Sequence, residues 1–236
     1  MATSKPRRRS FAARLVRGLA LVSLVWIVLS VGAVLALRAV DPPFTSVMLL
    51  QPGAFGEIKY TWVGRAAIAY DAARAVMAAE DQRFVVHHGI DFVQLDEALA
   101  DYRDGDGLRG ASTITQQVAK NLFLWQGRSL VRKGLEAYFA VLLELCLSKE
   151  RILEIYLNVA EFGPRVFGVE AAAREYFGKS AASLRAEEAA LLAAVLPNPQ
   201  RFLVARPSDY VRQRQDWIAD QMRLLESRGH YRGIHW

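Results

Sequence analysis

The sequence has little of the chemistry on which disulfide-bonded and metal-binding proteins depend. Among its 236 residues only Cys146 is a cysteine, which excludes an internal disulfide. Cys146 falls in the apolar pattern of a predicted helix, so we interpret its thiol as buried and unreactive. The 4 histidines form no HExxH motif, and no CxxC motif is present, so no metal site is predicted.

Acidic residues are missing from the first 40 positions, which carry 7 of the 30 Lys and Arg residues and none of the 24 Asp and Glu residues. The remainder has 30 − 7 = 23 basic against 24 acidic residues, so the net charge of +6 belongs to the N-terminus. This distribution indicates membrane topology, and we expect no nucleic-acid-binding domain.

An uncharged apolar run separates Arg17 from Arg38. Its roughly 20 residues can cross a bilayer core of about 30 Å, and they exceed the apolar region of a secretory signal. We therefore predict a basic cytoplasmic segment at 1–17 and a retained transmembrane helix at 18–38, although residues 33–36 leave cleavage open. The basic flank predicts a cytoplasmic N-terminus with the rest of the chain outside.

The sequence lacks sustained period-2 alternation and internal repeats, so a mainly α fold is predicted, with strands confined to short hairpins. Residues 39–60 contain Pro42, Pro43 and Pro52 and are expected to be an extended connector. The main domain is predicted at 61–228, followed by a tail at 229–236. The expected helices cover residues 66–80, 92–103, 112–123 with Ser112 as N-cap, 130–147, 149–158, 168–177, 183–196 and 209–226.

A glycine-rich segment at 104–110 matches two motifs only superficially. Gly105, Gly107 and Gly110 spell GxGxxG, but no strand precedes them, so a dinucleotide site is not predicted. Aligned as a calcium loop, the segment lacks the bidentate glutamate. We interpret it as a mobile loop.

Two acidic residues close the apolar run of residues 66–79. Glu80 is placed at the end of a hydrophobic helix, where partial desolvation would raise its pKa towards that of a general base. The alternative is a helix-terminal acid exposed to water. Asp81, Phe84 and His87 belong to the same segment, and His87 is interpreted as a structural residue of the turn.

The predicted helix at 112–123 carries two stripes. The apolar stripe consists of Ile114, Val118, Leu122 and Trp125. The polar stripe consists of Thr113, Gln117, Lys120 and Asn121. Hydroxyls, amides and a single cation suit a sugar and a phosphate, whereas a solvated face would mix more charges.

Farther along, Arg132 and Lys133 lie four and three residues before Glu136. These residues form either a weak ion pair on a helix surface or a phosphate-binding pair of cations whose charge holds Glu136 ionised.

In order along the chain, these segments resemble the monofunctional peptidoglycan glycosyltransferases, a membrane-anchored family related to the glycosyltransferase half of bifunctional penicillin-binding proteins. The resemblance covers about residues 60–205. Its motifs are EDxxFxxHxGxD at 80–91, GASTxxQQxxKN at 110–121, RKxxE at 132–136, KxRILExYLN at 149–158, GVxxAAxxYFGK at 168–179 and an alanine-rich segment ending in PNP at 184–199.

The resemblance implies a lysozyme-like helical fold and polymerisation of lipid II into glycan strands. It implies that Glu80 is the catalytic base and Glu136 a second essential acid. The substrate-binding set that it implies, with supporting residues included, is Asp81, Phe84, His87, Ser112, Thr113, Gln117, Lys120, Asn121, Arg132 and Lys133. No departure from the family pattern occurs at these positions.

No cofactor is expected, and assistance to the diphosphate by Mg or Mn is left open. The expected partners are lipid II, the growing strand and the inner (plasma) membrane, with cell-wall synthesis or division proteins left open. No SxxK motif is present and the chain ends soon after the last motif, so no transpeptidase activity is expected.

Two other classes of function compete with this interpretation. A lysozyme-type lytic enzyme would use a similar fold and a catalytic glutamate, but it needs neither phosphate-binding cations nor a lipid anchor. A non-catalytic membrane scaffold would leave the polar stripes as solvated faces, and Glu80→Gln would then have no effect.

Overall fold

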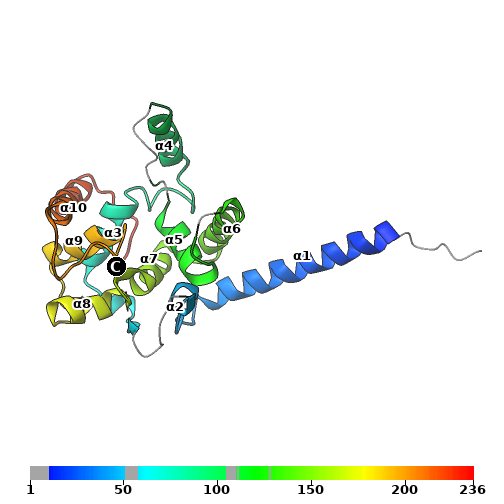
Figure 1. Cartoon of the computed structure of the whole chain (residues 1–236), viewed down its shortest axis with the longest axis horizontal. Helices are drawn as coiled ribbons and strands as arrows, with labels where there is room; N and C mark the ends of the chain where they lie inside the picture. The colour runs from blue at the N-terminus through cyan, green and yellow to red at the C-terminus, as the bar shows by residue number, and fades with distance from the viewer. Residues whose placement is uncertain (1–10, 51–57, 105–109, 111, 128) are drawn as a thin grey trace, which may run out of the picture. The chain divides into compact units, whose positions relative to one another are not determined.

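The computed structural model describes residues 11–50, 58–104, 110, 112–127 and 129–236. The chain divides into two compact units, Met1–Val40 and Asp41–Trp236. In the described part of the first unit, helix α1 (Phe11–Ala36) contains a stretch, Ala13–Ala36, that is long and apolar enough to cross a membrane (Figure 1). A signal sequence near an N-terminus passes the same test of length and composition.

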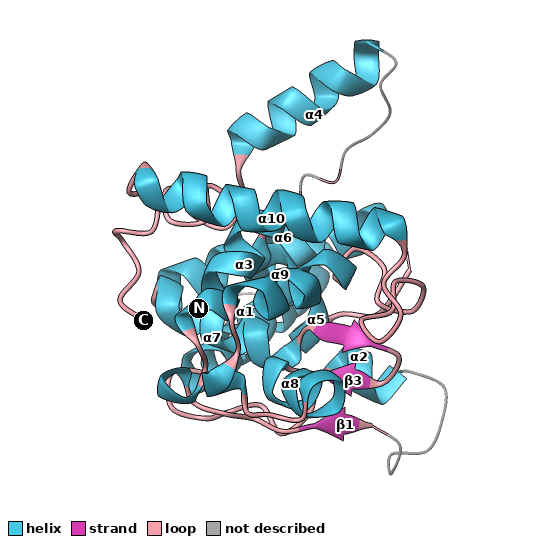
Figure 2. Ribbon diagram, turned by 90° about the vertical axis from the view of Figure 1, so that its left-hand side faces the viewer, coloured by secondary structure: helices cyan, strands magenta, loops and turns pink. Residues whose placement is uncertain are grey.

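The second unit is mainly helical, which confirms the predicted fold class (Figures 1 and 2). Its longer helices are α3 (Tyr70–Glu80), α4 (Phe92–Asp104), α5 (Ile114–Phe123), α6 (Leu130–Cys146), α7 (Lys149–Val159), α8 (Val169–Phe177), α9 (Ala186–Val195) and α10 (Asp209–Ser227). Two 3-10 turns precede α3 and α9: η2 (Arg65–Ala67) overlaps the start of the helix expected at 66–80, and η3 (Ala181–Ser183) ends at the first residue of the helix expected at 183–196. Residues 105–109 of the expected mobile loop lie outside the described residues.

Two groups of helices form the core. α10 packs across α9 and α3, and α5 packs against α6 and α7 (Figure 2). α9 is rich in alanine, and all of its buried residues are apolar. α4 extends away from both groups (Figure 2). Hydrogen bonds from Ile114 N to Asp81 and from the Gln117 amide to Glu80 join the end of α3 to the first half of α5.

Short hydroxyl side chains set several helix starts. The expected N-cap Ser112 is wrong by one residue, because Thr113 caps α5: its side chain accepts a hydrogen bond from Gln116 N, and the Gln116 side chain accepts one from Thr113 N. This reciprocal capping box satisfies two backbone donors at once. Ser129, Ser148 and Ser208 cap α6, α7 and α10.

Three very short strands form one sheet in the order β1-β3-β2. β1 (Lys59–Tyr60) runs parallel to β3 (Val166–Phe167), and β2 (Glu161–Gly163) pairs antiparallel with β3. The β2–β3 pair is a short hairpin of the kind expected, whereas the parallel pairing of β1 with β3 is not a hairpin and was not expected.

The segment 39–60 differs from the extended conformation expected for it. It contains helix α2 (Ser46–Leu50), which begins after the two prolines and receives a cap from Thr45, whose Oγ1 accepts a hydrogen bond from Met48 N. Val47 and Met48 pack on Phe167. Their burial stabilises a helix too short to form alone. Residues 51–57 of this segment lie outside the described residues.

The C-terminal residues also pack on the domain. Tyr231 and Ile234 are buried, and the Trp236 indole donates a hydrogen bond to Ile68 O at 2.9 Å. The sequence predicted only a tail for residues 229–236.

Candidate active site

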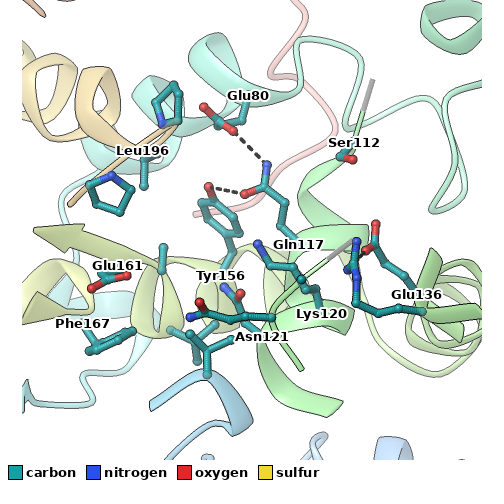
Figure 3. Close-up of a pocket in the computed structure, with 18 of the residues that line it drawn as sticks. Glu80, Ser112, Gln117, Lys120, Asn121, Glu136, Tyr156, Glu161, Phe167 and Leu196 are labelled. Carbon is teal, nitrogen blue, oxygen red and sulfur yellow. Dashed lines mark hydrogen bonds and ion pairs between the residues drawn. The ribbon is translucent and has the colours of Figure 1, made fainter. Parts of the chain in front are cut away.

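A cleft of about 680 Å³ opens beside the ends of α3 and α5 and the start of α6. Eight of the predicted site residues line it: Glu80, Ser112, Gln117, Lys120, Asn121, Arg132, Lys133 and Glu136. Figure 3 shows Gln117 and Lys120 between the carboxylates of Glu80 and Glu136. The structure thus brings together residues from three separate sequence motifs.

Glu80 is the last residue of α3, a helix whose alanines are buried in the core. Its side chain is only 13% exposed. Gln117 Nε2 donates a hydrogen bond to Glu80 Oε2 at 2.8 Å, and Tyr156 OH donates one to Gln117 Oε1 at 3.3 Å (Figure 3). Burial raises the pKa of Tyr156 well above its usual value, so the phenol stays neutral and donates. Tyr156 therefore fixes the Gln117 amide with its nitrogen towards Glu80.

The surroundings of Glu80 favour a carboxyl group that can take up a proton. Burial raises its pKa, while the Gln117 hydrogen bond and the charges of Arg214 and Lys120 act in the opposite direction. Asp81 adds a smaller contribution that raises the pKa. The net direction is upward, as a general base working near neutral pH requires.

Lys120 follows Gln117 by three residues on α5 and faces the same cleft. Burial lowers its pKa, an effect that the charge of Glu136 opposes. Within the described part of the chain, no hydrogen-bond or ion-pair partner contacts its ammonium group. A partly buried cation without a partner is costly unless an anion binds there.

Glu136 sits at the other side of the cleft and is almost fully buried, with its side chain 4% exposed. Arg132 Nη1 lies 2.6 Å from its Oε2, and Lys133 Nζ lies 2.5 Å from its Oε1. Lys133 also donates a hydrogen bond to Ser112 Oγ at 2.9 Å. The alternative of a weak surface ion pair is wrong for this carboxylate, because its partners hold it in a desolvated position.

Residues 51–223 match the family model for transglycosylases. The chain belongs to the transglycosylase family. Three similar proteins are each called a biosynthetic peptidoglycan transglycosylase. The one from Shewanella amazonensis is 47% identical over 93% of this chain and 93% of its own length. The one from Aeromonas hydrophila is 48% identical over 92% of this chain and 94% of its own length. The one from Chromohalobacter salexigens is 50% identical over 92% of this chain and 95% of its own length. The family resemblance drawn from the motifs is confirmed.

Four predicted site residues of this transglycosylase-family chain do not line the cleft. Asp81, Phe84, His87 and Thr113 are buried behind it. His87 Nε2 lies 2.9 Å from Asp81 Oδ1, and Asp81 Oδ2 accepts a hydrogen bond from Ile114 N at 3.0 Å. Asp81 directly follows Glu80, so its carboxylate links the end of α3 to the first turn of α5.

The remaining two of these residues complete that support. Thr113 Oγ1 donates a hydrogen bond to Gly89 O at 2.5 Å. Lys149 Nζ lies 4.4 Å from the centre of the Phe84 ring and donates a hydrogen bond to His87 O at 2.7 Å. Gly89 has φ +85°, and a Cβ there would meet Ala140 O at 3.1 Å, so this turn requires glycine. The four buried residues therefore support the positions of Glu80 and Gln117 without lining the cleft.

One acidic cluster resembles a metal site in spacing alone. The ligand atoms of Asp81, His87 and Asp91 lie within 4.8 Å of one another. Asp91, however, pairs with Arg83 at 2.9 Å and accepts a hydrogen bond from Val93 N at the start of α4. These acids already have partners in the turn, so we assign no ion to them. The expectation about a divalent metal stays a prediction.

Sequence reasoning missed two groups that reach the catalytic region. Tyr156 lies inside the KxRILExYLN motif, but no role was predicted for it. Arg214 Nη2 comes within 3.7 Å of Glu80 Oε1 from α10, outside every motif. The signal for Arg214 was its position three residues after Val211 and four before Ile218, both of which are buried. An arginine on the apolar face of a helix needs a partner inside the fold.

Proposed function

We propose that this chain is a peptidoglycan glycosyltransferase that polymerises lipid II into β-1,4-linked glycan strands. One observation carries the proposal: a desolvated carboxylate, Glu80, shares a cleft with a partly buried cation, Lys120, that makes no hydrogen bond or ion pair with any described residue. The similar proteins are called biosynthetic peptidoglycan transglycosylases, and these names support a glycosyl transfer in peptidoglycan synthesis.

In the proposed reaction, Glu80 takes the proton from the 4-hydroxyl of the acceptor GlcNAc. The hydroxyl oxygen attacks C1 of the donor MurNAc from the face opposite the diphosphate. The bond from C1 to the diphosphate oxygen breaks, its electron pair leaves with the polyprenyl diphosphate, and the α-linkage is inverted to β. General base catalysis of this kind contributes about 10²- to 10⁴-fold to a rate.

The cations of the cleft are proposed to receive the charge of the departing diphosphate. Lys120 makes no direct ion pair within the described residues, although the charges of Glu136 and Glu80 act on it, and Arg132 and Lys133 are held at the cleft by Glu136. Fixed positive groups aimed at developing negative charge stabilise a transition state without reorganising. In this scheme Glu136 orients Arg132 and Lys133 and takes no proton.

The N-terminal helix is proposed to be a single-pass anchor in the inner (plasma) membrane. Its basic flank, with no acid in the first 40 residues, supports a cytoplasmic N-terminus and a periplasmic catalytic unit. Tethering the cleft to the membrane raises the effective concentration of a polyprenyl-linked substrate. Lipid II and the glycan strand are the partners that the reaction requires, and contact with cell-wall synthesis or division proteins stays an expectation.

The test is a polymerisation assay with the purified full-length chain in detergent and lipid II as the substrate. We expect long strands and one polyprenyl diphosphate released per bond. Fragments released from preformed wall, without strands from lipid II, would instead support a lytic enzyme. Parallel reactions with a chelator, and with Mg or Mn restored, decide whether a divalent ion assists the diphosphate.

A further inference from the structure

Arg214 reaches the end of α3 from a helix that carries none of the predicted site residues. The buried residues of α10 are Val211, Ile218, Met222 and Leu225, and Arg214 lies on the side of the helix that they define. Its side chain is 23% exposed. Arg214 therefore belongs to the contact between α10 and α3.

Two contacts of the guanidinium group lie at the last turn of α3, and its central carbon also lies 6.0 Å from the centre of the Trp217 ring on α10 itself. Nη2 donates a hydrogen bond to Ala79 O at 3.3 Å and lies 3.7 Å from Glu80 Oε1. The last carbonyls of a helix lack donors within the helix, and they form the negative end of its dipole. Arg214 supplies both a donor and a positive charge at this end.

The two oxygens of Glu80 are held differently. Oε2 accepts the 2.8 Å hydrogen bond from Gln117. The 3.7 Å separation between Oε1 and Arg214 is too long for a hydrogen bond, so Oε1 keeps its lone pairs available. Oε1 is thus the oxygen that can accept a proton from a hydroxyl.

We propose that Arg214 is a positioning residue for Glu80, anchoring the last turn of α3 and presenting Oε1 to the acceptor hydroxyl as an ionised carboxylate. This inference rests on the proposed function, in which Glu80 is the base. It gives α10, a helix outside the sequence motifs, a part in positioning the base.

The charges around Glu80 explain why such a residue is needed. Burial raises the pKa of Glu80, and Asp81 adds to the increase. Gln117, Arg214 and Lys120 oppose it. From α7, the neutral Tyr156 acts through Gln117, and all the buried side chains of α9 are apolar. Loss of Arg214 therefore raises the pKa further, and more of the base is protonated at a given pH.

The turnover of the base follows from the same contact. When Oε1 takes the proton, Glu80 becomes neutral and its attraction to Arg214 is lost. Return of the proton to solvent restores that attraction. Arg214 thus favours the ionised form before each new bond is made.

The experiment measures kcat/KM for lipid II against pH for the full-length protein and four variants. Arg214→Gln keeps a donor for Ala79 O but removes the charge, whereas Arg214→Met removes both. We expect both variants to move the acid limb to higher pH, with a loss of about ten-fold on that limb and about two-fold on the plateau. Arg214→Lys should restore most of the profile, because it restores the charge.

Arg212→Met is the matched control, since Arg212 is an exposed arginine on the same helix, and it should leave the profile unchanged. An unshifted acid limb in a folded Arg214→Gln protein, or an equal loss at every pH, overturns the inference. Thermal unfolding of each variant separates misfolding from a change in the base. If Glu80→Gln retains polymerisation, the proposed function itself fails. If Glu80→Gln is inactive and the Arg214 profiles match the unchanged protein, only the role of Arg214 fails.

Discussion

Glu80 and Glu136 line one cleft, yet the groups around their carboxylates differ in kind. Glu80 has one amide hydrogen bond and a guanidinium at 3.7 Å. Glu136 has two cations, at 2.6 Å and 2.5 Å. The two cations at Glu136 occupy both of its oxygens, whereas Glu80 has no cation within hydrogen-bond distance among the described residues, and burial raises its pKa, so that it can take up a proton. The same residue type therefore supports two different roles within one site.

The largest expected effect is loss of activity in Glu80→Gln. An amide preserves the shape of the side chain but cannot accept the proton, so polymerisation of lipid II should fall about a thousand-fold. The assay is strand formation by the purified protein. Glu187→Gln, an exposed substitution on α9, is the control and should be fully active. Substantial strand synthesis by Glu80→Gln would remove Glu80 from the role of base.

Lys120→Met should lower kcat/KM for lipid II about a hundred-fold, because a cation for the diphosphate is lost from a desolvated position. The same change should maintain or increase thermal stability, since a partly buried charge without a partner is replaced by an apolar chain. Activity and thermal unfolding measured on one sample check both parts. A less stable Lys120→Met protein would show that the ammonium has a structural partner.

The comparison also predicts that replacing each glutamate by glutamine changes the free energy of unfolding in opposite directions. Glu80 has a raised pKa in the folded state, so its ionisation destabilises the fold as pH rises through that pKa. Glu80→Gln should therefore increase the free energy of unfolding at pH 7. Glu136→Gln should decrease it by about 2 kcal/mol, because Arg132 and Lys133 lose a buried anion. Urea unfolding at neutral pH measures both values, and equal signs would contradict the assignment.

Activity should depend on pH through two groups of opposite charge. It falls as pH drops through the raised pKa of Glu80, because the base becomes protonated. It falls again as pH rises through the lowered pKa of Lys120, because the cation is neutralised. Lys120→Arg should shift only the alkaline limb, to higher pH. A profile of kcat/KM in which that limb stays in place would assign it to another group.

The smallest expected effect is that of Tyr156→Phe. Without its hydroxyl, Gln117 loses the hydrogen bond that fixes its amide, and we expect about a five-fold loss of activity. The Michaelis constant for lipid II should change little, since Tyr156 acts through Gln117 on Glu80. A large rise in that constant with unchanged kcat would point to direct contact between the phenol and the substrate.

Several features of the site could be predicted from local sequence. Glu80 closes an alanine-rich helix, and Gln117, Lys120 and Asn121 share one helical face, so their spacing alone grouped them. The role of Thr113 could not be predicted from the local sequence. Its place in the polar stripe suggested a cleft residue, but the hydroxyl is used by the capping box and by Gly89 O. Local periodicity does not show which polar groups the fold itself consumes.

The sequence by itself determined the mainly helical fold, an apolar segment of membrane-spanning length and the order of the motifs that carry the family. These properties depend on composition and on spacing over a few turns. Only the tertiary structure decided that Glu80 is flanked by Gln117 and Arg214 while Glu136 is enclosed by cations. Burial and pKa depend on groups distant along the chain, such as α10 reaching back to α3, and no local pattern encodes those distances.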